Sequence, residues 1–367
     1  MKAMILAAGK GTRVRPLTYE MPKPMIPIMG KPVMEYLIEE LERHGFNEIM
    51  INISHLPEKI EDYFGNGERF GVEIGYSFEG HISNGEIVST ALGSAGGLKN
   101  IQEFGGFFDD TFLVVCGDAL IDLDLTQAVR DHWRSGAVAS ICALEVPKSQ
   151  VLNYGVVVCD DDGKITSFQE KPSVEEALSN LVNTGIYIFE PEIFDLIPAN
   201  TEFDIGGDLF PAILEKGLPF NAVNLPFNWI DIGRINDFWE ANQKIMQGDL
   251  RTIPMPGKEV QDGVWCGLNV KIDRGAVIQG PVYIGSGTHV EKDACIIGPT
   301  WIGNGCHIRS DANILRSIIF DYTRIGANSI VKESVAFGKF FVDREGNSFE
   351  SDQIKTDWVS DSRVKDS

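Results

Sequence analysis

An aliphatic residue recurs at every sixth position in the last third of the chain. The repeat runs through eight units, at Ile272, Ile278, Ile284, Val290, Ile296, Ile302, Ile308 and Ile314. A helix repeats every 3.6 residues and an ordinary strand every two, so neither explains a sustained period of six. A fixed short period is typical of a solenoid, in which each repeat buries its apolar face against its neighbours. We therefore expect residues 262–337 to form a solenoid of short parallel strands.

A second set of positions supports this prediction. Compact residues stand four places after the first seven aliphatic ones, at Ala276, Val282, Thr288, Ala294, Thr300, Cys306 and Ala312. The register slips by one residue and resumes at Ile319 and Ile325, which predicts three to four coils. The pattern resembles the left-handed parallel β-helix of hexapeptide-repeat proteins. His289 and His307 could serve an acyltransferase in such a fold, but no long loop interrupts the coils, which favours an assembly platform instead.

The last thirty residues lose the repeat. Residues 338–367 are rich in Asp, Ser and Glu, which is typical of a loosely held acidic tail. A short solenoid has open ends that need a cap. The tail offers little apolar surface beyond Phe340, Phe341 and Val342. We therefore expect a homo-oligomer in which the β-helix packs against a neighbouring subunit or against the first domain.

Residues 1–250 follow a different pattern, in which apolar strands alternate with amphipathic helices. A helix is expected over 32–44, and strands over 48–53, 112–116, 138–144 and 156–159. This alternation predicts an α/β domain with a Rossmann-like, mainly parallel sheet and helices on both faces. Ligands bind beyond the carboxyl ends of strands in such sheets. Gly9 and Asp118, which each follow a strand, should share one cleft.

The first strand ends in the turn Gly9-Lys10-Gly11-Thr12-Arg13. Glycine adopts positive φ cheaply and lets backbone N–H groups approach a phosphate closely. The turn fits neither the Walker pattern nor the dinucleotide fingerprint. The run LAAGKGTRVRPLT, followed by PKPMIPI at 22–28, resembles the signature of sugar-nucleotide pyrophosphorylases, which are nucleotidyltransferases of the nucleoside-diphosphate-sugar type. Members of that family also carry a C-terminal β-helix.

The resemblance implies a set of nucleotide-binding residues. They comprise Leu6, Ala7, Ala8, Gly9, Gly11 and Thr12 of the opening segment, with Gly93 and Ser94 of a loop over the base. Arg13 and Lys23 would be the catalytic cations that hold the triphosphate. The family usually has Thr where this chain has Ser94, and residues 79–88 differ from the usual approach to that loop. The identity of the base therefore stays open.

Two aspartates are implied to bind Mg²⁺. Asp118 ends the element Val115-Cys116-Gly117-Asp118, and Asp231 lies in Trp229-Ile230-Asp231-Ile232-Gly233. An aspartate between two isoleucines is costly to bury without a partner, which a nearby cation would supply. The alternatives are a helix N-cap for Asp118 and a hydrogen bond to backbone for Asp231.

On the sugar-phosphate side the resemblance implies Gly155, Glu170, Lys171 and Asn183. Glu170 and Asn183 would bind sugar hydroxyls, Lys171 would neutralise the sugar phosphate, and the backbone near Gly155 would touch the sugar. A sugar 1-phosphate is already ionised near neutral pH, so it can attack the α-phosphate of a nucleoside triphosphate in line, with pyrophosphate leaving. No covalent enzyme intermediate is implied.

Within the family the subgroup resembled most is mannose-1-phosphate guanylyltransferase, which makes GDP-mannose from GTP and mannose 1-phosphate. A UTP- or dTTP-dependent enzyme acting on glucose 1-phosphate is the alternative. A further one is a non-catalytic regulatory subunit that binds sugar nucleotides. Retention of Arg13, Lys23, Asp118 and Asp231 speaks against that subunit.

Composition limits the partners and the compartment. The formal net charge of −21 argues against nucleic acid or an anionic membrane as a partner. The six cysteines show no CxxC spacing, which favours reduced thiols, and no apolar run approaches membrane-spanning length. A cytoplasmic enzyme is expected.

Overall fold

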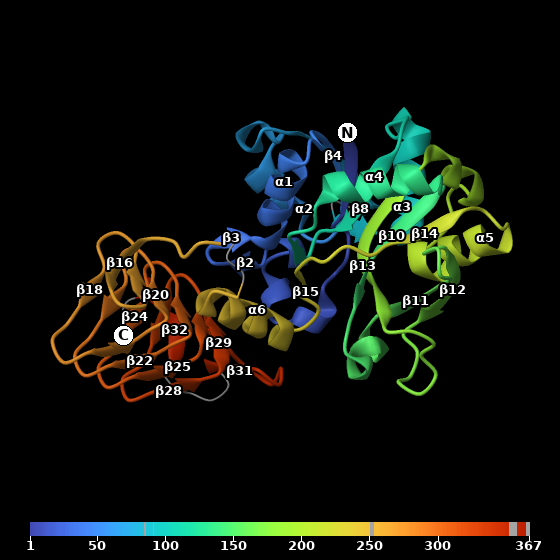
Figure 1. Ribbon diagram of the computed structural model, residues 1–367. Coiled ribbons are helices and arrows are strands. Elements are labelled where there is room, and N and C mark those ends of the chain that lie inside the picture. Colours follow the sequence, from blue (N-terminus) through green and yellow to red (C-terminus); the bar gives the residue numbers. More distant parts are fainter. Residues whose placement is uncertain (84–85, 91, 250–252, 352–357, 365–367) are drawn as a thin grey trace. The chain divides into compact units, whose positions relative to one another are not determined.

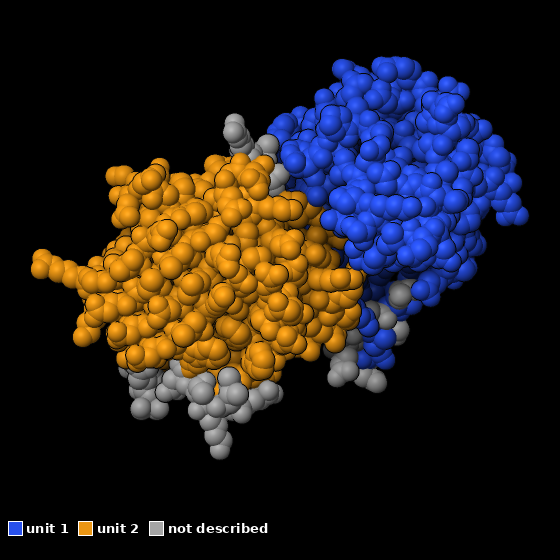
Figure 2. Space-filling view, turned by 60° about the horizontal axis from the view of Figure 1, so that its bottom comes forward, with its two compact units in different colours: residues 1–10, 21–26, 33–229 blue, residues 11–20, 27–32, 230–367 orange. Residues whose placement is uncertain are grey.

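The computed structural model describes residues 1–83, 86–90, 92–249, 253–351 and 358–364. The chain divides into two compact units, which are coloured in Figure 2. Unit 1 comprises residues 1–10, 21–26 and 33–229, and unit 2 comprises residues 11–20, 27–32 and 230–367. The glycine turn is thereby divided, because Gly9 belongs to unit 1 and Gly11 to unit 2.

A nine-stranded mixed sheet forms the centre of unit 1 (Figure 1). In one half, neighbouring strands run parallel in the order β5-β4-β1-β8. These strands are β1 (Lys2–Leu6), β4 (Glu48–Ile53), β5 (Glu73–Phe78) and β8 (Phe112–Cys116). The bounds predicted for β4 and β8 are confirmed.

The other half of the sheet begins with β13, which runs antiparallel to β8. Its strands are β10 (Ala139–Glu145), β11 (Gly155–Cys159), β12 (Ile165–Glu170), β13 (Leu181–Phe189) and β14 (Phe220–Val223). Short strands outside this sheet are β2 (Pro27–Ile28), β3 (Lys31–Pro32), β6 (Gly80–Ser83), β7 (Glu86–Ser89), β9 (Ala119–Ile121) and β15 (Trp229–Asp231). The sheet is therefore parallel where the opening strand lies and mixed beyond it.

Helices cover both faces of this sheet, as the sequence predicts. Ala3 and Ile5 of β1 pack in one apolar core, while Met4 between them packs in another. The first core includes side chains of α1 (Val33–Arg43), α2 (Pro57–Phe64) and α4 (Leu125–Ser135). The second includes those of α3 (Gly93–Gly105) and α5 (Phe210–Glu215). Single-turn and short irregular helices are η1 (Thr12–Val14), η2 (Leu17–Tyr19), η3 (Lys23–Met25), η4 (Glu68–Phe70), η5 (Lys148–Asn153), η6 (Pro191–Leu196) and the π-helix η7 (Ile205–Leu209).

Unit 2 contains α6 (Ile235–Gln247) and a parallel β-helix with three sheets. The first sheet contains β16 (Lys258–Gln261), β17 (Val264–Cys266), β20 (Val282–Ile284), β23 (Thr300–Ile302), β26 (Ile318–Ile319) and β29 (Ser334–Phe337). The second contains β18 (Lys271–Ile272), β21 (His289–Val290), β24 (His307–Ile308) and β27 (Thr323–Ile325). The third contains β19 (Val277–Gln279), β22 (Cys295–Ile297), β25 (Asn313–Leu315) and β28 (Ile330–Lys332). The solenoid expected from the six-residue period is confirmed.

The slip in the sequence register corresponds to a shorter corner between the third and first sheets. Val282 pairs with Thr300, 18 residues later, whereas Trp301 pairs with Ile318, 17 residues later. The earlier corners contain Gly280-Pro281 and Gly298-Pro299. The later ones contain Arg316 and Glu333, both with positive φ. A single residue with positive φ thus takes the place of the Gly-Pro pair, so the later corners are one residue shorter.

The prediction of a loosely held tail is wrong for the described residues after Gly338. Strand β30 (Phe340–Asp343) pairs antiparallel with β29, β31 (Ser348–Glu350) pairs with β30, and β32 (Val359–Asp361) pairs with β27. Val342 and Val359 are buried, and the rings of Phe341 and Trp358 stack at 5.0 Å. These few apolar residues suffice because the last coil offers unpaired strand edges that the tail extends.

The tail thus supplies a cap that the sequence argument for an oligomer did not anticipate. Homo-oligomerisation stays a prediction, as do the domain limits at 250, 262 and 337. A light-scattering mass of one 40.5 kDa chain at micromolar concentration would contradict the oligomer. Within the described part of the chain, no helix has both the length and the apolarity that crossing a bilayer requires.

Candidate functional site

A cavity of about 460 Å³ opens in unit 1 at the carboxyl ends of β1, β4 and β8. It is lined by Leu6, Ala8, Gly9, Lys10, Asn52, Ser54, Glu79, Gly93, Ser94, Cys116 and Asp118. The carboxyl ends meet at one edge because β1 runs parallel to both of its neighbours. Gly9 and Asp118 therefore share one cleft, as the sequence predicts.

Lys23 and Asp118 form an ion pair between Nζ and Oδ2, and both side chains are largely buried. Asp118 follows Gly117, whose N–H donates to the Leu6 carbonyl at 3.0 Å. A Cβ at position 117 would lie 2.9 Å from the Ile5 side chain, so glycine lets β8 end close against β1. The structure thus brings together two residues expected to bind the triphosphate and the metal. Their roles stay predictions.

A buried hydrogen-bond chain beside this pair was missed by the sequence interpretation. The Ala7 N–H donates to Asn52 Oδ1 at 2.7 Å, and Asn52 Nδ2 donates to Glu79 Oε1 at 2.7 Å. Glu79 is 5% exposed, and burial raises the pKa of its carboxyl above the usual value. The available signal was Asn52 itself, because a polar residue stood inside an apolar strand.

The start of α3 is held against a neighbouring loop. The N–H groups of Ala95 and Gly96 both donate to the Phe203 carbonyl at 2.9 Å. Gly93 has φ +72, and a Cβ there would lie 2.5 Å from the same oxygen. Ser94 Oγ donates to Asp204 Oδ2 at 2.7 Å and accepts from the Ile205 N–H at 2.8 Å. Gly93 and Ser94 line the cavity, and the Ser94 hydroxyl also fixes this loop. Contact with a base stays a prediction.

The residues expected on the sugar-phosphate side lie at the same end of three neighbouring strands. Gly155 of β11 pairs with Glu170 of β12, and Asn183 lies near the start of β13. Asn183 accepts from the Gly185 N–H at 2.9 Å and donates to the Tyr187 hydroxyl at 3.1 Å. Lys171 Nζ lies 2.5 Å from Glu170 Oε1, and both side chains are exposed. The Lys171–Glu170 pair is accessible to an anionic sugar.

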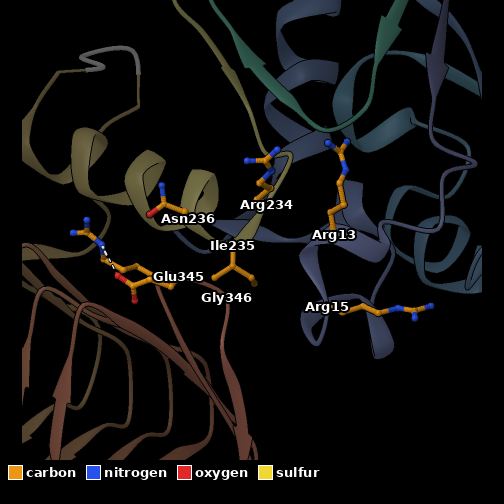
Figure 3. A pocket seen from close by; sticks show the side chains of 8 residues that line it. Arg13, Arg15, Arg234, Ile235, Asn236, Glu345 and Gly346 are labelled. Atoms are coloured by element: carbon orange, nitrogen blue, oxygen red, sulfur yellow. Dashed lines mark ion pairs between the residues drawn. The ribbon is translucent and has the colours of Figure 1, made fainter. Parts of the chain in front are cut away.

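Unit 2 contains a second cavity, of about 640 Å³ (Figure 3). It is lined by Arg13, Arg15, Arg234, Ile235, Asn236, Arg344, Glu345 and Gly346. Arg344 pairs with Glu345 and Glu333, and Arg15 lies over the Tyr19 ring and extends away from Arg234 in Figure 3. The predicted cation Arg13 therefore lines a cavity with Arg234, which the sequence interpretation did not single out. The sequence signal for Arg234 is that it directly follows the Asp231 motif, residues 229–233.

Gly11 and Thr12 lie in unit 2 beside Arg13 in sequence. Gly11 has φ +59, a conformation that favours glycine, and Thr12 begins η1. The Gly11 carbonyl accepts from the Val14 N–H at 3.0 Å and from Thr18 Oγ1 at 2.8 Å. Hydrogen bonds from nearby residues of the same segment therefore fix the conformation of the turn.

The two aspartates predicted to bind Mg²⁺ each carry a carboxylate, the hard oxygen donor that this ion prefers. A Cβ at Gly233 would lie 3.1 Å from Asp231 Oδ2 and 3.1 Å from Asp237 Oδ2. Glycine at 233 therefore leaves space between two carboxylates. Asp118 lies in unit 1 and Asp231 in unit 2, and their binding of Mg²⁺ stays a prediction.

The glycine turn after β1 and the Lys23–Asp118 pair thus lie at the carboxyl edge of an α/β sheet. Residues 2–248 match the nucleotidyl transferase family, and the chain belongs to that family.

Individual relatives cover the chain to different extents. The UTP–glucose-1-phosphate uridylyltransferase of Synechocystis sp. is 55% identical over 365 residues, which are 99% of this chain and 94% of that protein. The mannose-1-phosphate guanylyltransferase of Mycobacterium tuberculosis is 31% identical over 248 residues, or 67% and 65% of the two chains. Among solved structures, a putative glucose-1-phosphate thymidylyltransferase from Bacillus anthracis, in complex with a sucrose, matches with a TM-score of 0.58 at 25% identity, over 70% of this chain and 98% of that one.

Proposed function

We propose that this chain transfers the uridylyl group of UTP to glucose 1-phosphate, forming UDP-glucose and releasing pyrophosphate. Nucleotidyl transfer to a sugar 1-phosphate is the activity in the names of all three relatives described above. The choice of UTP and glucose depends on one observation, the 55% identity to the Synechocystis protein over 99% of this chain. The guanylyltransferase from M. tuberculosis is more distant and matches 67% of the chain. This favours the alternative expectation over GTP and mannose 1-phosphate.

The reaction joins two anions, so the protein must neutralise charge and align the reacting atoms. A phosphate oxygen of glucose 1-phosphate attacks the α-phosphorus of UTP, and the bond to the β-phosphate oxygen breaks. Lys23 pairs with Asp118, which lines the unit 1 cavity, and can turn its ammonium toward the triphosphate. Mg²⁺ held by Asp118 and Asp231 would supply positive charge for the α-phosphate oxygens.

Residues of β11 to β13 would hold the nucleophile. Lys171 lies on the surface beside Glu170 and can exchange that partner for the sugar phosphate. Glu170 and Asn183 offer a carboxylate and an amide for the glucose hydroxyls. The Asn183 side chain is already oriented by Gly185 and Tyr187, so it is positioned before the sugar arrives.

Arg13 and Arg234 would hold the leaving pyrophosphate. Both line the unit 2 cavity, and guanidinium groups bind phosphate oxygens in a bidentate manner. In a chain with a net charge of −21, such a local concentration of arginines attracts polyphosphate to this place.

A matrix of nucleoside triphosphates against hexose 1-phosphates, followed by pyrophosphate release, tests the proposal. We expect the highest kcat/KM for UTP with glucose 1-phosphate. A higher value for GTP with mannose 1-phosphate would overturn the assignment and restore the first expectation. Sugar-nucleotide binding without turnover for any pair would support the regulatory subunit instead.

A further inference from the structure

Two histidines lie one above the other on the second sheet of the β-helix. His289 of β21 pairs in register with His307 of β24, and their ring centroids are 5.2 Å apart with an interplanar angle of 12°. Their neighbours Val290 and Ile308 are fully buried, so the histidines face away from the solenoid core. Glu291 follows on the same face. One potential ligand atom from each of His289, Glu291 and His307 lies within 4.8 Å of the other two.

We propose that His289, Glu291 and His307 bind a divalent transition-metal ion of the Zn²⁺ type. Two imidazoles and one carboxylate suit Zn²⁺, Co²⁺ or Ni²⁺, whereas Mg²⁺ prefers oxygen donors alone. Bonds of about 2.0–2.2 Å place the ligand atoms of a tetrahedral ion about 3.4 Å apart. Here His307 Nε2 and Glu291 Oε1 are 2.8 Å apart, and the three ligand atoms lie within 4.8 Å of one another. Small side-chain rotations would bring them to the tetrahedral separation. The three side chains are partly exposed, so an ion can reach them and a water can complete the coordination.

The surrounding hydrogen bonds are those that metal ligands commonly make. His289 Nε2 lies 3.0 Å from Asp273 Oδ2, so the carboxylate can hold a proton there while the other ring nitrogen binds the ion. Glu291 Oε2 accepts from the Ser310 N–H at 2.9 Å, which orients the carboxylate. His307 Nε2 lies 2.8 Å from Glu291 Oε1, and an ion would replace the proton between them.

One cation competes for the same carboxylate. Arg309 Nε lies 3.4 Å from Glu291 Oε1 and neutralises it. Arg324, the register partner of His307, donates to the Ser362 and Val364 carbonyls. Removal of the Arg309 charge should therefore strengthen metal binding, an effect that a purely structural stack of histidines would not produce.

The ion would connect β21 to β24, and hence two successive coils of the solenoid. Binding to the folded state alone raises the unfolding temperature of the protein as the metal concentration increases. The site is separate from the aspartates proposed for Mg²⁺ and does not depend on the proposed function.

The test uses the full-length protein after removal of metals. Calorimetric titration with Zn²⁺, and the visible spectrum of bound Co²⁺, should show one tetrahedral ion per chain. His307→Ala and Glu291→Gln should lose it, Asp273→Asn should weaken it by about tenfold, and Arg309→Gln should bind more tightly. His44→Gln, which removes a histidine from unit 1, is the matched control and should bind as the parent does.

Circular dichroism confirms that each variant is folded, and Glu291→Gln keeps the side-chain shape if His307→Ala does not fold. Equal binding by the parent and both ligand variants would overturn the site. So would the absence of any stoichiometric Zn²⁺ or Co²⁺ binding in the parent and in Arg309→Gln.

Discussion

The β-helix of unit 2 and the α/β part of unit 1 differ in whether their characteristic residues repeat along the sequence. In the β-helix each buried position repeats one coil later, as Ile284 and Ile302 do in the first sheet. In unit 1 the informative residues, such as Lys23, Asn52 and Asp118, occur once each. A repeated fold can be predicted from sequence because every coil places apolar residues at the same positions. A reactive site has no second copy, so only a motif or a structure identifies it.

The largest effect should come from breaking the repeat. Ile302 is fully buried in β23, and replacing it by Ala should cost about 2–5 kcal/mol of stability through lost contacts and a cavity. Turnover per folded molecule should be unchanged if the β-helix is structural. Thermal unfolding followed by circular dichroism measures the first quantity and pyrophosphate release the second. Val277→Ala is the control, since Val277 is 58% exposed in β19. An equal loss from both variants would contradict the assignment of the buried stack.

The next effect concerns the site in unit 1. Asp118→Asn keeps the shape of the side chain but removes the charge that pairs with Lys23. Turnover should fall by roughly 10²-fold or more, which corresponds to about 3 kcal/mol of transition-state stabilisation. Asp109→Asn removes a well-exposed carboxylate paired with Lys2 and serves as the control. Near-normal kcat in Asp118→Asn, with Mg²⁺ present, would exclude the role proposed for this carboxylate.

A smaller effect is expected on pyrophosphate binding, and it should differ between Arg234 and Arg15 of the second cavity. Loss of a charge-assisted hydrogen bond costs about 1.5–3 kcal/mol, so Arg234→Ala should raise the KM for pyrophosphate in the reverse reaction by about tenfold or more. Arg15→Ala should change it little, because Arg15 lies over Tyr19. Pyrophosphorolysis at varied pyrophosphate measures both. If the two variants behave alike, Arg234 has no particular part in binding the leaving group.

Much of the architecture followed from sequence. The period of six predicted the solenoid, and the alternation of strands and helices predicted the α/β sheet. The glycine turn and Asp118 were expected in one cleft because parallel strands end at one edge. These inferences need local patterns only.

What the sequence did not reveal depends on residues far apart in the chain. Asn52 and Glu79 meet because β4 pairs with β5 in a register that sets Ile53 opposite Phe78. Composition predicts a loose acidic tail, yet Val359 is buried because β27 offers an unpaired edge. Both outcomes depend on which edges and donors the rest of the fold leaves available.

The smallest effect concerns the buried carboxyl of that missed pair. Burial raises the pKa of Glu79 in the folded protein above its value of about 4.5 in the unfolded chain, although Asn52 and the Leu92 N–H partly oppose this. The folded state then binds the proton more tightly, so this group contributes stability at low pH that is lost as pH rises through the folded pKa.

Glu79→Gln carries no charge at any pH. The variant should therefore gain stability relative to the parent as pH rises from about 4 to about 8. Denaturant unfolding at several pH values measures the difference, with Glu73→Gln as control, since Glu73 is exposed at the start of β5, the strand that precedes Glu79. A difference that stays constant with pH would show that the Glu79 carboxyl titrates alike in both states. The ionised Glu79 carboxyl would then cost the fold no more than the protonated one, and its hydrogen bond with Asn52 would explain this.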